Sequence, residues 1–569
     1  MSKNAQAFSG IALNATTHQV SNQVPALKDT NLLDSDPVLV DALNRYHTAW
    51  MRPDLERFGQ KMGSALMLEQ ANLANRHLPV LRTHDRVGNR IDEVDFHPSW
   101  HKLMSTSVAA GVHNLPWVRK LPGAHAARAA MMYMAYQTEA GHCCPISMTY
   151  AAYSVLDKSP DLAAHWQPRI RSKHFDGRLE IDGKSKRGAI FGMGMTEKQG
   201  GSDVRANTTI AKLVGNGEFA QSRLFAITGH KWFCSAPMSD AFLILAQSEK
   251  GLSCFLVPRV LPNGKRNVFQ IQRLKDKLGN KSNASSEVEF RDTLAYLVGE
   301  EGRGVATIIE MVTHTRLDCA IGSASLMRQS VVQAVHHTRH RSTFGKLLID
   351  QPMMKNVLAD LALESEAAAL LAMRLANAFD LAPANQSEES FRRITSAIAK
   401  YWLCKRAPTH VVEGLECHGG NGYVEEHVMP RLFRESPLNS IWEGSGNIMC
   451  LDVMRAIAKE AGAIDTLEAE LAKSRTFSTI YDSAATAVIG KLHMLKAAAM
   501  AGRDDAQVMA RRVVEELALV LQASLMIRYS APFAADAFIQ SRLDKSHGYT
   551  YGTLSLGTKF DDIIGRYVP

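Results

Sequence analysis

One central stretch differs in pattern from the sequence on either side of it, and this contrast most constrains the fold. Between about residues 188 and 300, short apolar runs such as AFLILAQ and LSCFLVP alternate with turn-forming sequences such as PNGKRN and KLGNKSN. Short apolar runs bounded by Gly, Pro and Asn are typical of strands. The flanking stretches carry apolar residues at helical spacing. The sequence therefore predicts a mainly α-helical protein with a small antiparallel sheet or barrel in its middle.

Helical spacing is clearest near the two ends of the chain. Leu55, Phe58, Met62 and Leu66 fall on one face of a helix that begins near Pro53, and the helical pattern continues to about residue 180. Near the C-terminus an amphipathic helix is predicted from Val513, Leu517, Val520, Leu521 and Leu525.

Length and pattern together predict several domains, because 569 residues exceed what one hydrophobic core usually holds. We expect an N-terminal arm, a helical domain, a β-domain, a helical bundle and a further helical section. Their expected bounds are 1–40, 41–184, 185–304, 305–450 and 451–569.

Composition narrows the class of protein. Hydrophobic residues make up 46% and charged residues 21%, which is typical of a folded globular enzyme. The net charge of +8 permits an acidic partner or a phosphate-bearing cofactor without requiring either. The eight cysteines form no C-x-x-C pair, the first residues lack a signal-peptide pattern, and no long uncharged apolar run exists. We therefore expect free thiols, a cytoplasmic location and no membrane span.

Three short segments carry candidate chemistry. MTEKQGGSDV, from Met195 to Val204, combines two glycines with hydroxyl and carboxylate groups, which suits a polar planar ligand bound through backbone amides. In GHKWFCSAP, side-chain alternation along a strand places Phe233 and Ser235 on one face. By themselves these segments could equally be an ordinary glycine turn and an ordinary strand end.

The third segment is IWEGSGN, in which Glu443 lies between Trp442 and Gly444. A carboxylate beside a large aromatic ring should have its pKa raised by desolvation, which suits a general base that works near neutral pH. The alternative is a solvent-facing loop glutamate.

His336, His337 and His340 suggest a metal site, since residues four apart share a helix face. No H-E-x-x-H pattern is present, and Arg339 and Arg341 oppose a cation. We therefore expect no metal here and interpret the segment as a polar helix at a subunit interface.

Taken together and in order, the segments resemble the acyl-CoA dehydrogenase flavoproteins over about residues 60–450. TEKQGGSD is similar to the T-E-x-x-x-G-S-D loop of that family, and GHKWFCSA to its G-x-K-x-W-I-T-N strand. KLGNKSNASSEVEF resembles G-x-R-x-S, RSTFGK resembles R-x-x-F-G, and GGNGYVEE with IWEGSGN resembles G-G-x-G-Y and Y-E-G-T. GMGMTEKQGGSDV and NSIWEGSGNIMCLDV resemble more closely still the branch of the family that responds to DNA alkylation.

The resemblance implies FAD as cofactor and a fold of N-terminal helices, a small β-barrel or sheet and a C-terminal four-helix bundle, plus the extra helical section. It also implies that FAD is shared between subunits of a homotetramer. The loop residues would bind FAD, and all of them except Lys198 and Val204 would line the flavin pyrimidine edge. The strand end would lie beside the reactive nitrogen of the flavin, the R-x-x-F-G segment would reach the FAD of a neighbouring subunit, and the last loop would touch the adenine half. In that order the residues are Met195, Thr196, Lys198, Gly201, Ser202 and Val204; Ser235, Ala236 and Pro237; Arg341 and Phe344; and Trp442, Gly444 and Asn447.

By the same resemblance, Glu443 is the catalytic base that removes the proton α to an acyl thioester. Some relatives carry the base before a helix arginine that corresponds to Arg316, but Thr315 stands there in this chain and cannot serve. Phe233 replaces the usual tryptophan of the family, and Trp442 its usual tyrosine. We expect the larger indole to narrow the acyl pocket, so that a redox-competent flavin is retained while ordinary acyl-CoA substrates turn over poorly.

The resembled branch is associated with DNA binding, but the residues themselves support it only weakly. Residues 451–569 contain fourteen Lys/Arg and fourteen Asp/Glu, and no helix-turn-helix, zinc-finger or basic-zipper pattern is visible. A local cluster would suffice for phosphate contacts. For such a cluster we expect Arg503, Arg511, Arg512 and Arg528 to share an exposed face.

Three functions remain open at this point. The first is a flavoenzyme that acts on an acyl thioester or on a small alkylating compound. The second is a flavoprotein that shields double-stranded DNA and needs little catalysis, and the third is a relic that has lost its flavin. An ordinary dehydrogenase of short or branched acyl-CoA with no DNA role is the alternative form of the first.

Overall fold

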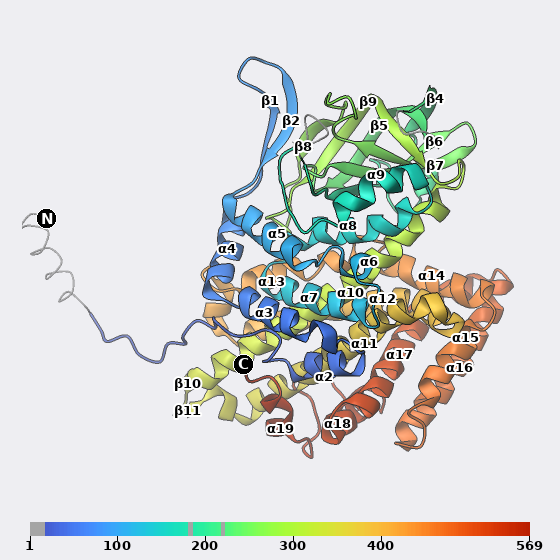
Figure 1. The fold of residues 1–569 in the computed structure, drawn as a ribbon. Helices are drawn as coiled ribbons and strands as arrows, with labels where there is room; N and C mark the ends of the chain where they lie inside the picture. Colours follow the sequence, from blue (N-terminus) through green and yellow to red (C-terminus); the bar gives the residue numbers. More distant parts are fainter. Residues whose placement is uncertain (1–16, 180–185, 218–221, 545) are drawn as a thin grey trace, which may run out of the picture.

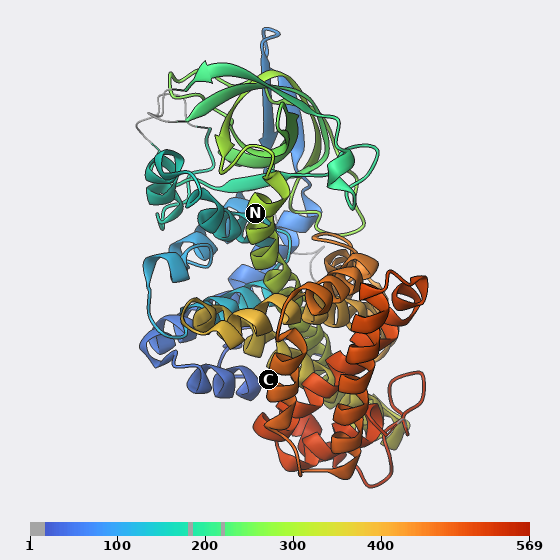
Figure 2. The same ribbon diagram turned by 90° about the vertical axis from the view of Figure 1, so that its right-hand side faces the viewer.

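A computed structural model describes residues 17–179, 186–217, 222–544 and 546–569 (Figure 1). A β-barrel lies at one end of the molecule, a layer of long helices crosses the middle, and the C-terminal helices pack on the other side of that layer (Figures 1 and 2). The predicted fold, mainly α-helical with a central β-domain, is confirmed.

The N-terminal helices begin earlier than expected. Helix α2, Pro37–Arg45, starts inside the predicted arm, and the Asp36 carboxylate caps it by accepting the Leu39 N–H. Residues 1–16 of that arm lie outside the described residues.

The expected single helix with Leu55, Phe58, Met62 and Leu66 on one face is wrong at its end. Helix α3, Arg52–Met62, buries the first three, but it stops at Gly63, and Leu66 lies on the next helix with 60% of its surface exposed. Only glycine fits at this break, because a Cβ on Gly63 would lie 1.8 Å from the Thr30 carbonyl oxygen. Ser64 then caps the second helix, α4, Ala65–Arg76.

A two-stranded hairpin interrupts the region that we expected to be entirely helical up to about residue 180. Strands β1, Val80–His84, and β2, Arg90–Asp95, pair antiparallel and project from the body (Figure 1). The turn is built by Asp85, whose carboxylate accepts the Val87 and Asn89 N–H groups, and by Gly88 at φ +91°. The sequence Gly88–Asn89 was the turn signal that the helical interpretation overlooked.

Five further helices complete the N-terminal part. They are α5, Pro98–Ala110; α6, Leu115–Val118; α7, Ala124–Thr138; α8, Cys143–Leu156; and α9, Pro160–Ile170.

Five of the seven strands of the β-domain close into a barrel, while β3 pairs only with β6 and β8 only with β9. Strand β6 pairs with both β4 and β7, and the pairings β4–β5, β5–β9 and β9–β7 close the ring. Most pairings are antiparallel as expected, but β3 and β4 run parallel to β6. Phenylalanines such as Phe225, Phe242, Phe255 and Phe269 fill the interior. The strands are β3, Phe191–Gly194; β4, Ile210–Asn216; β5, Arg223–Ser235; β6, Ala241–Ser248; β7, Gly251–Pro258; β8, Gln270–Leu274; and β9, Ser285–Val298.

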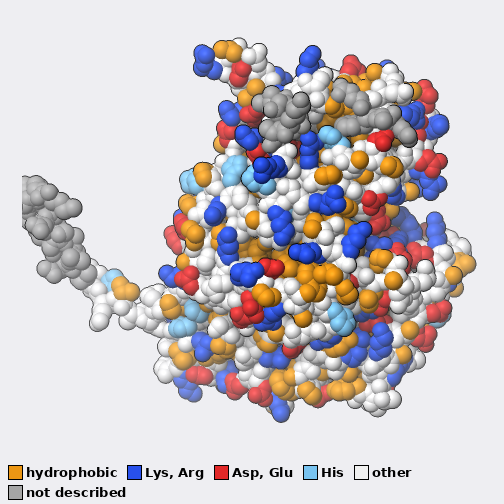
Figure 3. Space-filling view, viewed as in Figure 1, with side chains coloured by type: hydrophobic (Ala, Val, Ile, Leu, Met, Phe, Trp, Pro, Cys, Tyr) orange, Lys and Arg blue, Asp and Glu red, His pale blue; other side chains and the backbone are white. Residues whose placement is uncertain are grey.

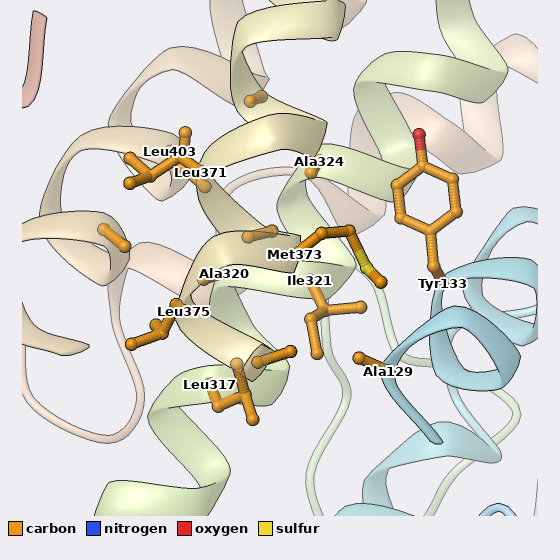
Figure 4. Close-up of a cluster of buried hydrophobic side chains, with 14 of the residues drawn as sticks. Ala129, Tyr133, Leu317, Ala320, Ile321, Ala324, Leu371, Met373, Leu375 and Leu403 are labelled. Carbon is orange, nitrogen blue, oxygen red and sulfur yellow. The ribbon is translucent and has the colours of Figure 1, made fainter. Parts of the chain in front are cut away.

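The 37-residue helix α10, Gly304–His340, runs through the middle of the protein. Its buried face of Leu317, Ala320, Ile321 and Ala324 follows helical spacing and packs against α7, α11 and α12 (Figure 4). The remaining elements are the short strands β10, Ser342–Thr343, and β11, Lys346–Leu347, followed by α11, Pro352–Leu381; α12, Gln386–Glu416; α13, Met429–Glu435; and α14, Gly446–Lys459.

The last section is a helical layer that covers α11 and α12. Helix α17 buries all five residues of the predicted amphipathic run, and this prediction is confirmed. The expectation that Arg528 shares an exposed face with the other arginines is wrong, because its guanidinium turns inward to Glu470 Oε1 at 2.7 Å and is 13% exposed. The helices are α15, Ala463–Ala472; α16, Thr479–Met500; α17, Asp504–Tyr529; α18, Pro532–Arg542; and α19, Phe560–Gly565.

All eight cysteines are buried and free, as expected. Within the described ranges, the structure contains no helix with the length and hydrophobicity that a membrane crossing requires.

The buried ion pair between Arg128 of α7 and Asp318 of α10 yields a stability prediction. Changing Asp318→Asn leaves an uncompensated buried guanidinium, so the free energy of unfolding should fall by about 3–5 kcal/mol. Urea unfolding followed by circular dichroism measures it. Asp54→Asn, which removes the exposed partner of Arg57, is the control and should change the free energy by less than about 1 kcal/mol. Equal effects of the two substitutions would contradict the prediction.

Candidate active site

The loop from Met195 to Val204 is held against strand β5 by a buried ion pair. Lys231 Nζ lies 2.7 Å from Glu197 Oε1, and both side chains are inaccessible to solvent. The other oxygen of Glu197 accepts the Thr208 N–H at 2.7 Å. The Asn207 amide donates to the Met195 carbonyl oxygen at 2.9 Å. Glu197 and Asn207 therefore tie the start of the loop to strand β5 and to the residues that follow its end.

The predicted ligand residues of this loop differ in exposure, and two of them pair with strand β5. The Thr196 carbonyl oxygen accepts the Trp232 N–H at 2.8 Å, and the Lys198 N–H donates to His230 Nε2 at 3.0 Å. Gly201 must lack a side chain, because its Cβ would lie 2.5 Å from Thr196 Oγ1. Gly201 and Ser202 are exposed, and Val204 is half-buried. The loop thus presents backbone and a hydroxyl to its open side.

The end of strand β5 presents a second surface. Phe233 is 46% exposed and Ser235 half-buried, while Cys234 between them is fully buried. Ala236 follows at φ +53°, where its N–H donates to the Ala284 carbonyl oxygen at 2.8 Å. A left-handed backbone at a non-glycine residue costs free energy, and such positions cluster at functional sites.

Glu443 adopts the same strained conformation, with φ +58°. Its carboxylate accepts a hydrogen bond from the Thr315 hydroxyl of α10 at 2.8 Å. Arg316 Nε donates to the Glu443 carbonyl oxygen at 3.2 Å. Lys400 of α12 donates to the carbonyl oxygens of Trp442, at 2.7 Å, and of Gly444. Two buried cations therefore hold the loop in this conformation.

The electrostatics of Glu443 follow from this setting. Burial raises the pKa of its carboxyl, as expected from the sequence, and the Thr315 hydroxyl and the charges of Lys400 and Arg316 lower it in part. The net direction is upward. A carboxylate with a raised pKa is a stronger base than one in water.

Cys144, near the start of α8, shows that these segments converge. Burial raises the pKa of its thiol to about 12, and the Ser235 hydroxyl and the charge of Glu443 both act on that pKa. Neither polar atom of the buried Asn283 amide has a hydrogen-bond partner, and buried polar groups are normally paired. A ligand with polar edges placed between Ser235 and Glu443 fits this arrangement, so the residues present are compatible with an isoalloxazine ring.

Two residues predicted to contact FAD do not lie near Glu443 within the same chain. Arg341 and Phe344 follow the far end of α10, roughly 40 Å from Thr315 at about 1.5 Å per residue. Arg341 donates to the Asn22 carbonyl oxygen at 2.5 Å, and Phe344 is 99% exposed. Asn447 lies exposed in the first turn of α14, close in sequence to Glu443.

The histidine segment lies on the last turns of α10. The His336 and His340 rings are 4.5 Å apart, and His336 Nε2 lies 2.8 Å from the Pro25 carbonyl oxygen. No cluster of three or more His, Cys, Asp or Glu side chains suited to a metal ion occurs in the ranges that the structure describes.

Family models divide the chain into three matched parts. Residues 22–177 match the adaptive response protein AidB N-terminal domain, 192–293 the acyl-CoA dehydrogenase middle domain, and 302–458 the acyl-CoA dehydrogenase C-terminal domain. This chain belongs to the acyl-CoA dehydrogenase family, whose members are FAD-dependent oxidoreductases, and it carries the AidB type of N-terminal domain.

Individual relatives agree with this assignment. AidB of Escherichia coli (strain K12) is 43% identical over 94% of this chain and 95% of its own length. The structure of Caenorhabditis elegans ACDH-11 in complex with C11-CoA has a TM-score of 0.82 at 26% identity, covering 97% of this chain and 93% of that chain. Bacillus anthracis acyl-CoA dehydrogenase complexed with FAD shares the fold, with a TM-score of 0.62 at 17% identity, covering 79% of this chain and 81% of that chain. FAD is the cofactor expected of this family.

Sequence reasoning missed the residues that hold Glu443. We dismissed Thr315 because it cannot act as a base, although its place at the alternative base position implied that it lies beside Glu443. Lys400 left no signal, because nothing in a long helical run marks the one lysine that turns inward.

Thr315 gives a prediction for Glu443. Changing Thr315→Val removes a hydrogen bond to the charged carboxylate, so the pKa of Glu443 should rise further, whereas Thr315→Ser should leave it nearly unchanged. A pH titration of the carboxyl infrared band, assigned by its loss in Glu443→Gln, measures the value. A pKa that does not move in Thr315→Val would contradict the assigned hydrogen bond.

Proposed function

We propose that this protein oxidises an acyl thioester, with Glu443 as the base that removes the proton α to the carbonyl. The observation that carries the proposal is the setting of Glu443: a half-buried carboxylate on a strained backbone, with a raised pKa and a hydrogen bond from the Thr315 hydroxyl. ACDH-11, a relative of similar fold, binds C11-CoA.

The chain's own residues divide the work in this reaction. Thr315 engages Oε2 of Glu443, which leaves the other oxygen for the substrate proton. Lys400 and Arg316 fix the backbone on both sides, so that the carboxylate keeps one orientation. Such positioning supplies a large part of the rate enhancement of an enzyme. FAD, when bound, accepts the electron pair that leaves the substrate.

We propose that FAD is held by the residues that the family motifs indicate. Met195, Thr196, Gly201 and Ser202 would line the pyrimidine edge, and Ser235, Ala236 and Pro237 would lie beside the reactive nitrogen. Lys198 and Val204 of the same loop would also contact the cofactor, and Trp442, Gly444 and Asn447 would meet the adenine half.

We further propose a homotetramer in which each FAD is shared between subunits. Arg341 and Phe344 lie roughly 40 Å along α10 from Thr315 and so serve a different site from their own Glu443. An exposed Phe344 at φ +52° supports a contact that is completed by another chain. A guanidinium such as that of Arg341 pairs well with a diphosphate.

The position of Trp442 supports the proposal that ordinary acyl-CoA substrates turn over slowly. Its indole is half-buried against the core, and its Nε1 donates to Asn439 Oδ1 at 3.0 Å, so the ring is fixed beside Glu443. The alternative is an ordinary dehydrogenase of short or branched acyl-CoA, for which rates near typical enzyme values would be required.

The substitution Glu443→Gln tests the proposed base. The purified protein should be yellow, and an acyl-CoA panel under anaerobic conditions should bleach the flavin of the wild type. Glu443→Gln should keep the flavin spectrum and slow the bleaching by about a hundredfold to ten-thousandfold. Unchanged bleaching would reject the base assignment, and a colourless protein that takes up no FAD would reject the flavin site.

We propose, as a second function, that the protein binds double-stranded DNA in a response to alkylation damage. Residues 22–177 match the N-terminal domain of an adaptive response protein. Arg511 of α17 and Lys405 of α12 both face Cys450 of α14, and the adjacent Arg512 side chain is 74% exposed. On the face shown in Figure 3, Lys and Arg are scattered among Asp and Glu, so a DNA contact would rest on a local cluster such as this one.

A gel-shift assay over a salt series tests DNA binding. The double variant Arg511→Gln, Arg512→Gln should bind more weakly. Its negative slope of log affinity against log salt should become shallower by about 0.9 for each phosphate that the variant no longer neutralises. Arg57→Gln, on the exposed surface of α3, is the control and should bind as the wild type. No binding by the wild type at low salt would remove the proposal.

A further inference from the structure

A buried lysine in the loop between β8 and β9 reaches the candidate flavin site through one hydroxyl group. Lys277 Nζ donates to Ser285 Oγ at 3.0 Å and to the Asn283 carbonyl oxygen. Ser285 Oγ lies 3.2 Å from Ser235 Oγ. Ser235 belongs to the strand end assigned to the reactive nitrogen of the flavin. Lys277 is absent from that assignment and makes no contact with Glu443 in the described part of the chain.

A lysine ammonium can only donate, so Ser285 accepts from Lys277. Either hydroxyl of the Ser285–Ser235 pair can be the donor. When Ser285 donates, Ser235 accepts and its own proton is directed onward. The chain Lys277–Ser285–Ser235 thus presents a donor, backed by a positive charge, at the place where the flavin nitrogen would lie.

Nearby charged groups leave this ammonium unpaired. Cys144 on α8, Glu139 before α8 and Glu435 on α13 face Lys277. The carboxylate of Glu139 binds the His142 imidazole and N–H, Glu435 accepts the Asn280 N–H at 2.8 Å, and Cys144 is a neutral thiol below pH about 12. Within the described ranges, no carboxylate comes within ion-pair distance of Lys277 Nζ. Burial without a partner lowers the pKa of Lys277 to about 8, although these three groups act in the opposite direction.

We propose that Lys277 is a positioning residue that raises the reduction potential of bound FAD through Ser285 and Ser235. The inference rests on the proposed flavin site and deepens it by assigning the group that tunes the cofactor. A positive charge in a low-dielectric setting favours the electron-rich state of the ring beside it.

A dependence on pH follows with a definite sign. Because the reduced cofactor favours the charged lysine, the pKa of Lys277 is higher beside reduced FAD than beside oxidised FAD. Reduction therefore takes up a fraction of a proton near pH 8, and the midpoint potential falls more steeply with rising pH in that region. Neutralising the lysine removes both the charge and the extra slope.

The test is a potentiometric titration of the FAD-loaded protein with a reference dye between pH 6.5 and about 9.5. Lys277→Met should lower the potential, so that the ratio of reduced to oxidised FAD at a fixed dye potential falls by roughly tenfold. It should also lose the extra slope near pH 8. Lys277→Arg should keep the higher potential without the slope, because arginine stays charged throughout this range.

Two further variants separate tuning from a structural role. Ser285→Ala keeps the lysine and cuts the chain, so it should also lower the potential. Lys281→Met removes the same charge from the same loop without a bond to Ser285, and its potential should match the wild type. Equal potentials in wild type, Lys277→Met and Ser285→Ala would overturn the inference while leaving the flavin site in place. A wild-type protein that takes up no FAD would overturn the proposed function and the inference together.

Discussion

Burial of helix α10 is the constraint on which the rest of the structure depends. Its apolar face packs against α7, α11 and α12. This packing fixes the rotation of the helix about its own axis and its position between the neighbouring helices. Many of its buried side chains are also polar, and the charged ones need partners inside the protein because an unpaired buried charge is costly. Asp318 binds Arg128, and Arg316 binds Asp452 as well as the Glu443 backbone. Thr315, the residue before Arg316, donates a hydrogen bond from its hydroxyl to the Glu443 carboxylate. The candidate base is therefore held by the same helix that organises the core.

Strain and electrostatics support each other at the site. Ala236 and Glu443 hold left-handed backbone conformations that are unfavourable on their own. Each is over-determined by hydrogen bonds from neighbouring elements: Ala284 for the first, and Lys400 with Arg316 for the second. The cations that pin the Glu443 loop also moderate the rise of the Glu443 pKa. One set of contacts thus sets both the orientation and the basicity of the carboxylate.

Burial acts in opposite directions on two groups near this site. It raises the pKa of Glu443 and lowers that of Lys277, in both cases because a charged group is disfavoured away from water. Both values move toward neutrality. A carboxylate that is more basic than one in water and an ammonium that releases its proton more readily both suit a reaction coupled to proton transfer.

The order of helices, barrel and helices was predictable from the sequence, since the spacing of apolar residues and turn-forming Gly, Pro and Asn is a local property. The sequence also predicted the upward direction of the Glu443 pKa, although its main cause is burial, and Thr315 and Lys400, which act on it, are distant in the chain. The break at Gly63 and the hairpin at Gly88 depend on contacts or turns that outweigh periodicity, and there the sequence-based expectation was wrong. Only the tertiary structure decided that Thr315 binds Glu443, that Arg528 turns inward to Glu470, and that Lys277 connects to Ser235 through Ser285. These contacts join segments far apart in the chain, and no local pattern records which polar side chain of a helix or loop will face a distant partner.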